Sequence, residues 1–149
     1  MSLQQKFNLG KCFDCNKERS GVGWCKDCEI NAFKRDFKSW TSGDPKIDSF
    51  IQHTQLNGTG CHDYLEYIDY KQFDLVKSTN KKSSFSTIFS AIWLEGPRWI
   101  WDEAIEQWTR NGPIKVALKR LENMSEEYLN NVCQNIYYYF LFFFCLKVL

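Results

Sequence analysis

The sequence lacks an excess of charge of either sign. Its 19 basic and 18 acidic residues are mixed along 149 residues, and the formal net charge is +1. Proteins that bind nucleic acid or the membrane surface through charge usually concentrate basic residues in one region. The balanced charge therefore argues against nucleic acid and against a membrane surface as partners.

The chain also begins without a secretory signal. Its first residues, MSLQQKFNLGK, lack the basic start and the continuous apolar run that such signals contain. We therefore expect a cytoplasmic protein whose thiols are kept reduced.

Long apolar runs are scarce as well. The tail contains ten unbroken apolar residues from Tyr137 to Leu146, whereas a helix that crosses a bilayer needs about 20. A membrane anchor is therefore the weaker interpretation of the tail, residues 134–149. The run favours either a core strand or an apolar chain end that stays exposed.

Histidine is rare, but cysteine is not. The chain has two histidines, to which we assign no role, and seven cysteines. Four of the cysteines form two CxxC pairs with nine residues between them: Cys12, Cys15, Cys25 and Cys28. Each pair places two thiolates on one tight turn, and the intervening loop is long enough to bring the two turns together around one tetrahedral ion.

We therefore predict a zinc knuckle over residues 10–30. Because four sulfur ligands close the coordination shell, the zinc would be structural rather than catalytic. The alternative is that these cysteines are free or form disulfides. Both the odd number of cysteines and a reducing compartment disfavour a disulfide framework.

Residues 31–60 predict a linker of two short helices. Apolar side chains recur at helical spacing ahead of the TSGD segment, at Ile30, Phe33, Phe37 and Trp40. A second helix is predicted from Asp44, as the N-cap, and Pro45, as the first helical residue, to Asn57-Gly58. Its apolar face would consist of Ile47, Phe50 and Ile51.

The composition then shifts to strand-forming residues. Apolar segments starting at Tyr64 and at Phe85 flank a polar run, so we predict a hairpin that turns between Ser78 and Ser84. The later segment KVALK, which ends at Lys119, is typical of a buried strand that carries one cation. In the segment from Phe85, apolar residues alternate as in a strand with one buried face: Phe85, Phe89, Ala91 and Trp93.

An acidic, tryptophan-rich insert over residues 95–113 separates these strands. It lies between the dipeptides Gly96-Pro97 and Gly112-Pro113, and we predict a loop with a short helical piece. Its tryptophans are predicted to cover the sheet: Trp99, Trp101 and Trp108. A further helix is predicted over residues 124–133.

Five segments, in their order along the chain, carry a resemblance to a known family. They are KCFDCN, WCKDC, FKSWTSG, FSTIFSAIWLEGP and VALK. Together they resemble the expanded fungal protein-kinase-like proteins that place a four-cysteine knuckle and a WTSG-containing helical segment ahead of the kinase domain. The resemblance covers most of residues 10–133. It implies a partial, degenerate kinase N-terminal lobe, an antiparallel sheet plus one helix, over residues 64–133, so the predicted fold class of the chain is α+β.

The resemblance also implies a nucleotide site. Lys119 matches the third-strand lysine that pairs with the nucleotide phosphates. Ala117 matches the small residue over the adenine, and Ile88 matches the branched residue that follows the glycine-rich loop. Through these three residues the resemblance implies ATP, with Mg²⁺, as a ligand.

The chain departs from the family pattern in ways that weaken this site. Lys81, Ser83 and Ser86 stand where the family has the glycines that let the loop approach phosphate closely. The helix glutamate that pairs with the lysine falls at Asn131, with Glu127 one turn earlier as a substitute. No HRD-type catalytic loop, DFG or APE follows, and these segments supply the base and the metal ligands of phosphoryl transfer.

We therefore predict a truncated, catalytically inactive protein-kinase-like protein with structural zinc and at most weak ATP binding. The alternative, from another class, is a zinc-stabilised interaction module whose aromatic insert docks another protein, such as a full-length kinase of the same family. An active kinase is disfavoured by the missing motifs, and a gene fragment that does not fold stably is the remaining interpretation.

Overall fold

The computed structural model of the protein describes residues 9–60, 63–83, 86–102, 104–105, 107–121, 125 and 127. Its helices are α1 (Lys26–Asp36), α2 (Pro45–Asn57) and the short 3₁₀ turn η1 (Tyr70–Gln72). Its strands are β1 (Phe73–Ser83), β2 (Ser86–Trp93), β3 (Arg98–Asp102), β4 (Gln107–Arg110) and β5 (Ile114–Leu121). The helices precede an antiparallel sheet, so the predicted α+β class is confirmed.

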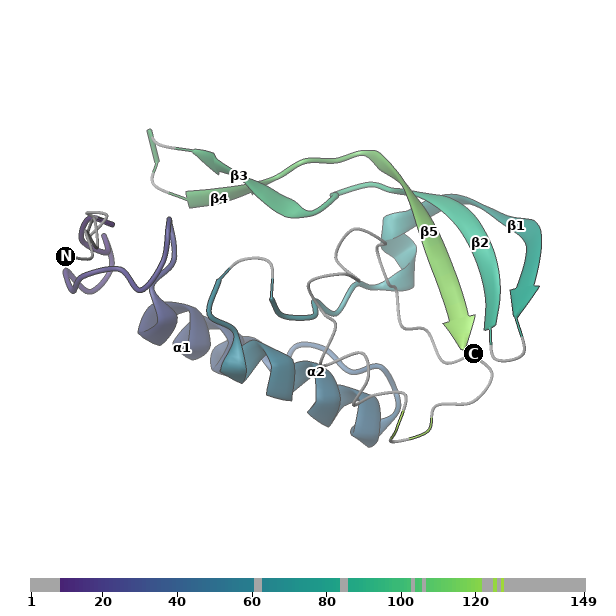
Figure 1. Ribbon diagram of the computed structural model, residues 1–149, viewed down its shortest axis with the longest axis horizontal. Helices are drawn as coiled ribbons and strands as arrows, with labels where there is room; N and C mark the ends of the chain where they lie inside the picture. The colour runs from purple at the N-terminus through teal and green to yellow at the C-terminus, as the bar shows by residue number, and fades with distance from the viewer. Residues whose placement is uncertain are drawn as a thin grey trace, which may run out of the picture.

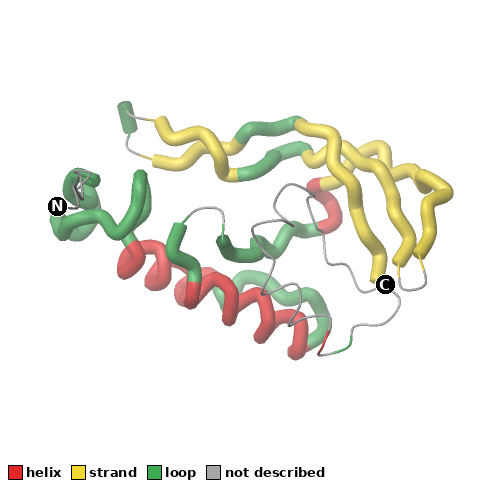
Figure 2. The backbone as a smooth tube through the Cα atoms, viewed as in Figure 1, coloured by secondary structure: helices red, strands yellow, loops and turns green. Residues whose placement is uncertain are grey.

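The strands form two sheets that are continuous along the chain (Figure 1). β1, β2 and β5 make a three-stranded sheet in the order β1-β2-β5, and β3 pairs with β4 in a two-stranded sheet. The chain leaves β2, passes through the β3–β4 hairpin and returns as β5, so the hairpin extends the β2–β5 pair into a long ribbon. Residues 9–25, which precede α1, lie near the hairpin end of this ribbon, and the two helices run beneath it in the view of Figure 2.

A hydrophobic core lies on one face of the three-stranded sheet, at the end of the ribbon away from the hairpin. Its buried residues come from all three strands: Phe73, Ala91, Trp93, Val116 and Leu118. The register pairs Ala91 with Val116 and Phe89 with Leu118, so residues directly opposite each other share this face. The alternation predicted for the second strand is confirmed at Phe89, Ala91 and Trp93, whereas Phe85 lies outside the described residues. The prediction that KVALK is buried holds for one face only, because Val116 and Leu118 are buried but Lys115 and Ala117 are exposed.

Helix α2 follows its predicted boundaries. The Asp44 side chain accepts a hydrogen bond of 2.8 Å from the backbone N–H of Lys46, and Pro45 occupies the first helical position, where no intrahelical N–H partner is required. The buried face includes Ile47 and Ile51, which are 0% and 3% exposed. Local capping chemistry and apolar spacing are therefore sufficient to locate this helix.

Helix α1 differs from its prediction at both ends. It starts at Lys26, within the second CxxC, because Cys25 of the knuckle is its N-cap residue, and it ends at Asp36. Trp40 consequently lies beyond the helix, and its ring stacks on that of Tyr67 at a centroid distance of 4.9 Å. The aromatic spacing that resembles a longer helix thus reflects a contact with the segment before β1.

The predicted hairpin is confirmed, because β1 pairs with β2, but its predicted turn from Ser78 to Ser84 is too long: β1 continues to Ser83 and pairs there with Ser86. The pairing of β1 with β2 is irregular at two places, between Asp74 and Lys77 and between Ser78 and Lys81. Leu75 and Asn80, which lie at these places, adopt positive φ angles of 50° and 58°. The hydroxyl of Thr79 donates a 2.7 Å hydrogen bond to the carbonyl of Ile88. Polar residues are compatible with a strand here because most of them are exposed at the sheet edge.

The helical piece predicted within residues 95–113 is also wrong, since this segment forms the β3–β4 hairpin. Asp102 closes the hairpin end: its carboxylate accepts hydrogen bonds from the backbone N–H groups of Ala104, at 2.9 Å, and Ile105, at 3.3 Å. Aspartate is common at the first residues of helices, but Asp102 stabilises the turn of a hairpin instead.

Gly96 and Gly112, the predicted brackets of this insert, lie against each other where the hairpin joins the sheet. A Cβ atom added to Gly96, whose φ is +69°, would lie 2.5 Å from the nitrogen of Gly112, and one added to Gly112 would lie 2.3 Å from the carbonyl carbon of Glu95. Only residues without a side chain allow the two chain segments to approach this closely.

Arg110 joins the hairpin to the rest of the molecule at the same place. Its guanidinium donates to Glu66, 2.9 Å from Oε2, and to the carbonyl of Gly96 at 3.0 Å. Glu95, whose Oε2 lies 3.7 Å from Arg110 Nε, also accepts a 2.9 Å hydrogen bond from Gln72. Hydrogen bonding to Glu66 raises the pKa of Arg110 despite partial burial.

Several predictions concern residues that the structure does not describe. Apart from Ser125 and Glu127, the helix predicted over residues 124–133 lies outside the described residues, as do Asn131 and the tail over residues 134–149. In the described part of the chain, no helix has the length and apolar character needed to cross a membrane.

Candidate metal centre

The first CxxC pair lies on a tight turn. The backbone N–H of Asn16 donates to the carbonyl of Cys12 at 2.8 Å, and the N–H of Cys12 donates to the carbonyl of Lys17 at 2.7 Å. Asn16 adopts a φ of 58°, a conformation that asparagine tolerates better than most residues. This turn brings Cys12 and Cys15 to one side of the loop.

The second CxxC pair spans a turn and the start of a helix. Cys25 is the N-cap of α1, and Cys28 lies in the first helical turn. The N–H of Glu29 donates to the carbonyl of Cys25 at 3.0 Å. Because the N-terminus of a helix carries a partial positive charge, it favours the thiolate form of cysteines placed there.

The two turns bring all four sulfur atoms together. The Sγ atoms of Cys12, Cys15, Cys25 and Cys28 all lie within 4.8 Å of one another, with 3.8 Å between Cys12 and Cys28 and 3.6 Å between Cys15 and Cys25. A tetrahedral site with metal–sulfur bonds of about 2.3 Å has edges of about 3.8 Å. The cluster therefore has the size required to hold a metal ion, and the separations are far too long for disulfide bonds.

The protonation of these thiols depends on their surroundings. Burial raises the pKa of Cys28 and of Cys25, whereas a hydrogen bond from the backbone of Lys17 lowers the pKa of Cys15. A bound cation that displaces the protons would hold all four groups as thiolates.

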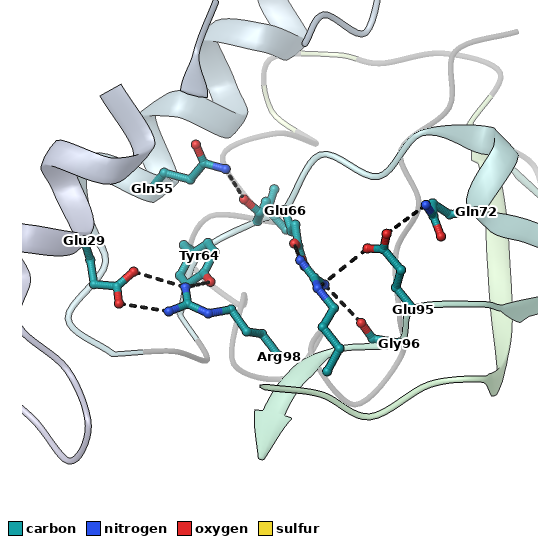
Figure 3. Close-up of polar contacts among 10 residues, drawn as sticks. Glu29, Gln55, Tyr64, Glu66, Gln72, Glu95, Gly96 and Arg98 are labelled. Atoms are coloured by element: carbon teal, nitrogen blue, oxygen red, sulfur yellow. Dashed lines mark hydrogen bonds and ion pairs between the residues drawn. The ribbon is translucent and has the colours of Figure 1, made fainter. Parts of the chain in front are cut away.

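The β3–β4 hairpin contacts the segment that carries the second CxxC. The indole Nε1 of Trp108 donates a 2.8 Å hydrogen bond to the carbonyl of Gly23. Arg98 forms a two-point ion pair with Glu29, with 2.9 Å between Nη2 and Oε1 and 3.1 Å between Nη1 and Oε2. Figure 3 shows the Arg98 side chain reaching from the hairpin to Glu29 on the helix.

This ion pair is largely removed from solvent. The side chains of Arg98 and Glu29 are 25% and 17% exposed, and the hydroxyl of Tyr64 accepts a further 3.4 Å hydrogen bond from Arg98. Burial by itself lowers the pKa of Arg98, but hydrogen bonding and attraction to Glu29 outweigh it and raise the pKa. Burial also raises the pKa of Tyr64, to about 12.

An aromatic cluster fills the space between the knuckle, α1 and the hairpin. Trp24 and Tyr64 are its buried members, and Phe33 and Trp108 pack against them. The ring centroids of Trp24 and Tyr64 are 5.7 Å apart, and those of Phe33 and Tyr64 are 4.8 Å apart. Trp108 therefore packs beside the knuckle rather than over the three-stranded sheet, which corrects its predicted position. The side chains of Trp99 and Trp101 lie outside the described residues.

A cavity of about 230 Å³ lies between the knuckle and the hairpin. Three of the four cysteines line it, together with charged residues and with Phe13, Ile105 and Trp108. Phe13 and Ile105 are 83% and 56% exposed, respectively. The four-cysteine cluster is thus adjacent to a surface on which large apolar side chains face solvent.

The residues predicted to contact nucleotide lie at the opposite end of the ribbon. Ile88 on β2 pairs directly with Lys119 on β5, and Ala117 pairs with Ser90 two positions along. Ile88, Ala117 and Lys119 therefore share one face of the sheet, opposite the face that carries the core. Ile88 and Lys119 are half-buried, and Ala117 is exposed.

Comparison with family models, with curated proteins and with solved structures found no match for this chain.

The residues that join the hairpin to the knuckle were not identified from the sequence. Arg98 and Glu29 are 69 positions apart, and Trp108 and Gly23 are 85 apart. No local pattern connects such residues. The one sequence signal was the isolated basic residue after Gly96-Pro97, whose charge requires an acidic partner once the segment packs.

Proposed function

We propose that this chain is a zinc-binding, protein-kinase-like protein that binds nucleotide weakly at best and does not transfer phosphate with the residues it contains. The observation that carries the metal part is the four-sulfur cluster, whose 3.6 and 3.8 Å separations fit a tetrahedral ion. Four thiolates form a soft ligand set that suits zinc, and a closed shell leaves no position for a substrate.

Metal analysis of the reduced protein tests this part of the proposal. We expect one zinc per chain, lost in Cys12→Ser and in Cys25→Ser. Cys133→Ser, which changes a cysteine outside the CxxC pattern, is the matched control and should keep the metal. A reduced preparation that holds no zinc contradicts the proposal.

The kinase-like part is supported by the arrangement of the three-stranded sheet. The order β1-β2-β5, with an insert between β2 and β5, is the order that the sequence resemblance implies for the first three strands of a kinase N-terminal lobe. The shared face of Ile88, Ala117 and Lys119 is consistent with a surface that contacts a nucleotide. Lysine at this position would attract phosphate, whereas Lys81, Ser83 and Ser86 would hinder its close approach.

A thermal-shift titration with Mg-ATP tests this part. We expect a small stabilisation of the wild-type protein that is lost in Lys119→Ala. Lys115→Ala, which removes an exposed lysine from the same face of β5, should respond like wild type. If Mg-ATP raised the melting temperature of both variants by the same amount, Lys119 would not contact the nucleotide. Phosphoryl transfer to any substrate would contradict the non-catalytic assignment.

A second candidate function is a zinc-stabilised interaction module. It is favoured by the exposure of Phe13 and Ile105, which line the same cavity at the knuckle. At about 230 Å³ this cavity is smaller than most small-molecule sites, which occupy roughly 300–1,000 Å³. It is better suited to one large apolar side chain of another protein, such as a full-length kinase of the same type.

Site-specific photo-crosslinking distinguishes this candidate. A photo-crosslinking amino acid at position 13 should capture a full-length kinase partner, and the same group at position 115, at the start of β5 in the three-stranded sheet, should not. Capture of equal amounts from both positions would contradict a docking site at the knuckle.

A further inference from the structure

The β3–β4 hairpin contacts the knuckle through two side chains, Trp108 and Arg98, and the acceptor of each lies near a cysteine of the metal centre. Gly23, whose carbonyl accepts from Trp108, lies two residues before Cys25. Glu29, which pairs with Arg98, directly follows Cys28. The position of both acceptors is therefore set by the backbone that carries the second CxxC pair.

Both contacts depend strongly on geometry. The Arg98–Glu29 pair is largely buried, and a buried ion pair compensates for its desolvation only when its hydrogen bonds are well aligned. The indole of Trp108 presents a single donor and reaches one carbonyl, at 2.8 Å. A small shift of the turn or of the helix start would therefore weaken both contacts.

The turn before Cys25 is held by a few backbone hydrogen bonds, by the buried ring of Trp24 and by the cysteine that follows it. Gly21 and Trp24 exchange backbone hydrogen bonds of 3.1 Å in each direction, and Gly23 adopts a φ of +59°. A four-residue turn of this kind is marginal by itself, and small metal sites commonly derive their folding free energy from the bound ion.

The far end of the ribbon has a separate core. Among the residues that the structure describes, the cluster around Trp24 and Tyr64 shares no member with the cluster around Phe73 and Trp93 in the three-stranded sheet. The two ends of the ribbon can therefore lose structure independently.

We propose that occupancy of the metal centre controls the docking of the β3–β4 hairpin. With the ion bound, Gly23 and Glu29 are held where Trp108 and Arg98 reach them. When the ion is removed, the hairpin separates from the knuckle while β1, β2 and β5 stay paired. The hairpin thus acts as a metal-dependent latch, and this inference rests on the metal binding proposed above.

Hydrogen exchange of the zinc-loaded and chelator-treated full chain tests the latch. The amides of β3 and β4 should exchange at least tenfold faster after zinc removal. The amides of β5, within the same ribbon, should keep their protection and serve as the internal control for folding. Zinc content is measured on the same samples.

A reciprocal experiment uses variants of the hairpin. Binding energies are coupled symmetrically, so weakening the latch must weaken zinc binding by the same factor. Trp108→Phe keeps an aromatic ring but removes the donor to Gly23, and should bind zinc about fivefold more weakly, at the lower end of typical coupling. Lys115→Ala, remote from the knuckle, should bind zinc like wild type.

The outcomes separate the latch from the metal proposal. If zinc is bound and its removal leaves β3 and β4 as protected as before, the latch is overturned and the metal site stands. If β5 loses protection together with the hairpin, the metal supports the whole fold and the latch is likewise overturned. If the reduced protein binds no zinc, both proposals are wrong.

Discussion

Trp24 is fully buried although its neighbour in the sequence, Cys25, belongs to the four-cysteine cluster. Its ring packs against Phe33 and Tyr64, with centroid distances of 6.4 and 5.7 Å. Its indole Nε1 has no hydrogen-bond acceptor among the described residues, and an unsatisfied buried donor costs about 1–3 kcal/mol. The burial of the ring must therefore contribute more than this to the stability of the knuckle.

Replacing this ring should destabilise the protein strongly. Trp24→Ala should lower the free energy of unfolding by about 3–5 kcal/mol, because it leaves a cavity among aromatic side chains. Phe13→Ala, which changes an aromatic residue of the same knuckle that is 83% exposed, should change it by less than about 0.5 kcal/mol. Urea unfolding of the zinc-loaded proteins measures both, and equal losses would contradict the packing described for Trp24.

Asp48 stabilises the turn before α2 in a pH-dependent way. Its carboxylate accepts hydrogen bonds from the hydroxyl of Thr41, at 2.6 Å, and from the backbone N–H of Ser42, at 2.8 Å. Burial alone raises the pKa of Asp48, but the hydrogen bonds from Ser42 and Thr41 outweigh it and lower the pKa below 3.8.

The sign of the pH dependence follows from this lowered pKa. The folded state binds the proton less tightly than the unfolded state, so the stabilisation is complete above the usual pKa of 3.8 and is lost as the pH falls through the lower folded value. Asp48→Asn should therefore lose about 1 kcal/mol at pH 7 and less near pH 3. Thermal unfolding across this range would contradict the assignment if the loss were the same at every pH.

At the scale of single elements, features with a local cause were predicted well. The four cysteines come together because their spacing places two tight turns face to face, and α2 begins at Pro45 because Asp44 caps it. The β3–β4 hairpin was not predicted, because the acidic residues that favour a helix start also favour a turn, as Asp102 does. The pairing of β3 with β4, and the contact of Trp108 with the distant Gly23, decide between a helix and a hairpin here.

The junction between the hairpin and the sheet depends on Gly96 and Gly112. Gly112→Ala should destabilise the protein by about 1–3 kcal/mol, the usual effect of overpacking, because its Cβ atom would lie 2.3 Å from backbone atoms of Glu95. Gly60→Ala is the matched control, since no atom of the described residues lies within 4 Å of a Cβ atom at that position. If both variants unfold at the same urea concentration, the chain around Gly112 does not pack as closely against Glu95 and Gly96 as described.

At the scale of the whole molecule, the ribbon connects two distinct cores. The cluster around Trp24 includes residues from the knuckle, from α1 and from the hairpin, whereas the sheet core comes from β1, β2 and β5. Arg110 links the ribbon to Glu66 between the two. Sequence patterns predicted the sheet and the knuckle separately, but the contacts that join them are formed by residues far apart in the chain and carry no periodic signal.

The contact between Gly96 and Gly112 also means that the segment between them can be replaced without altering the sheet. Because the chain leaves the sheet and returns to it at the same point, the length and sequence of residues 97–111 can vary without separating β2 from β5. A variant that joins residue 96 directly to residue 112 should keep Phe89 opposite Leu118 and lose every contact between the ribbon and the knuckle. Such a segment can acquire a new binding role while the sheet that carries it stays unchanged.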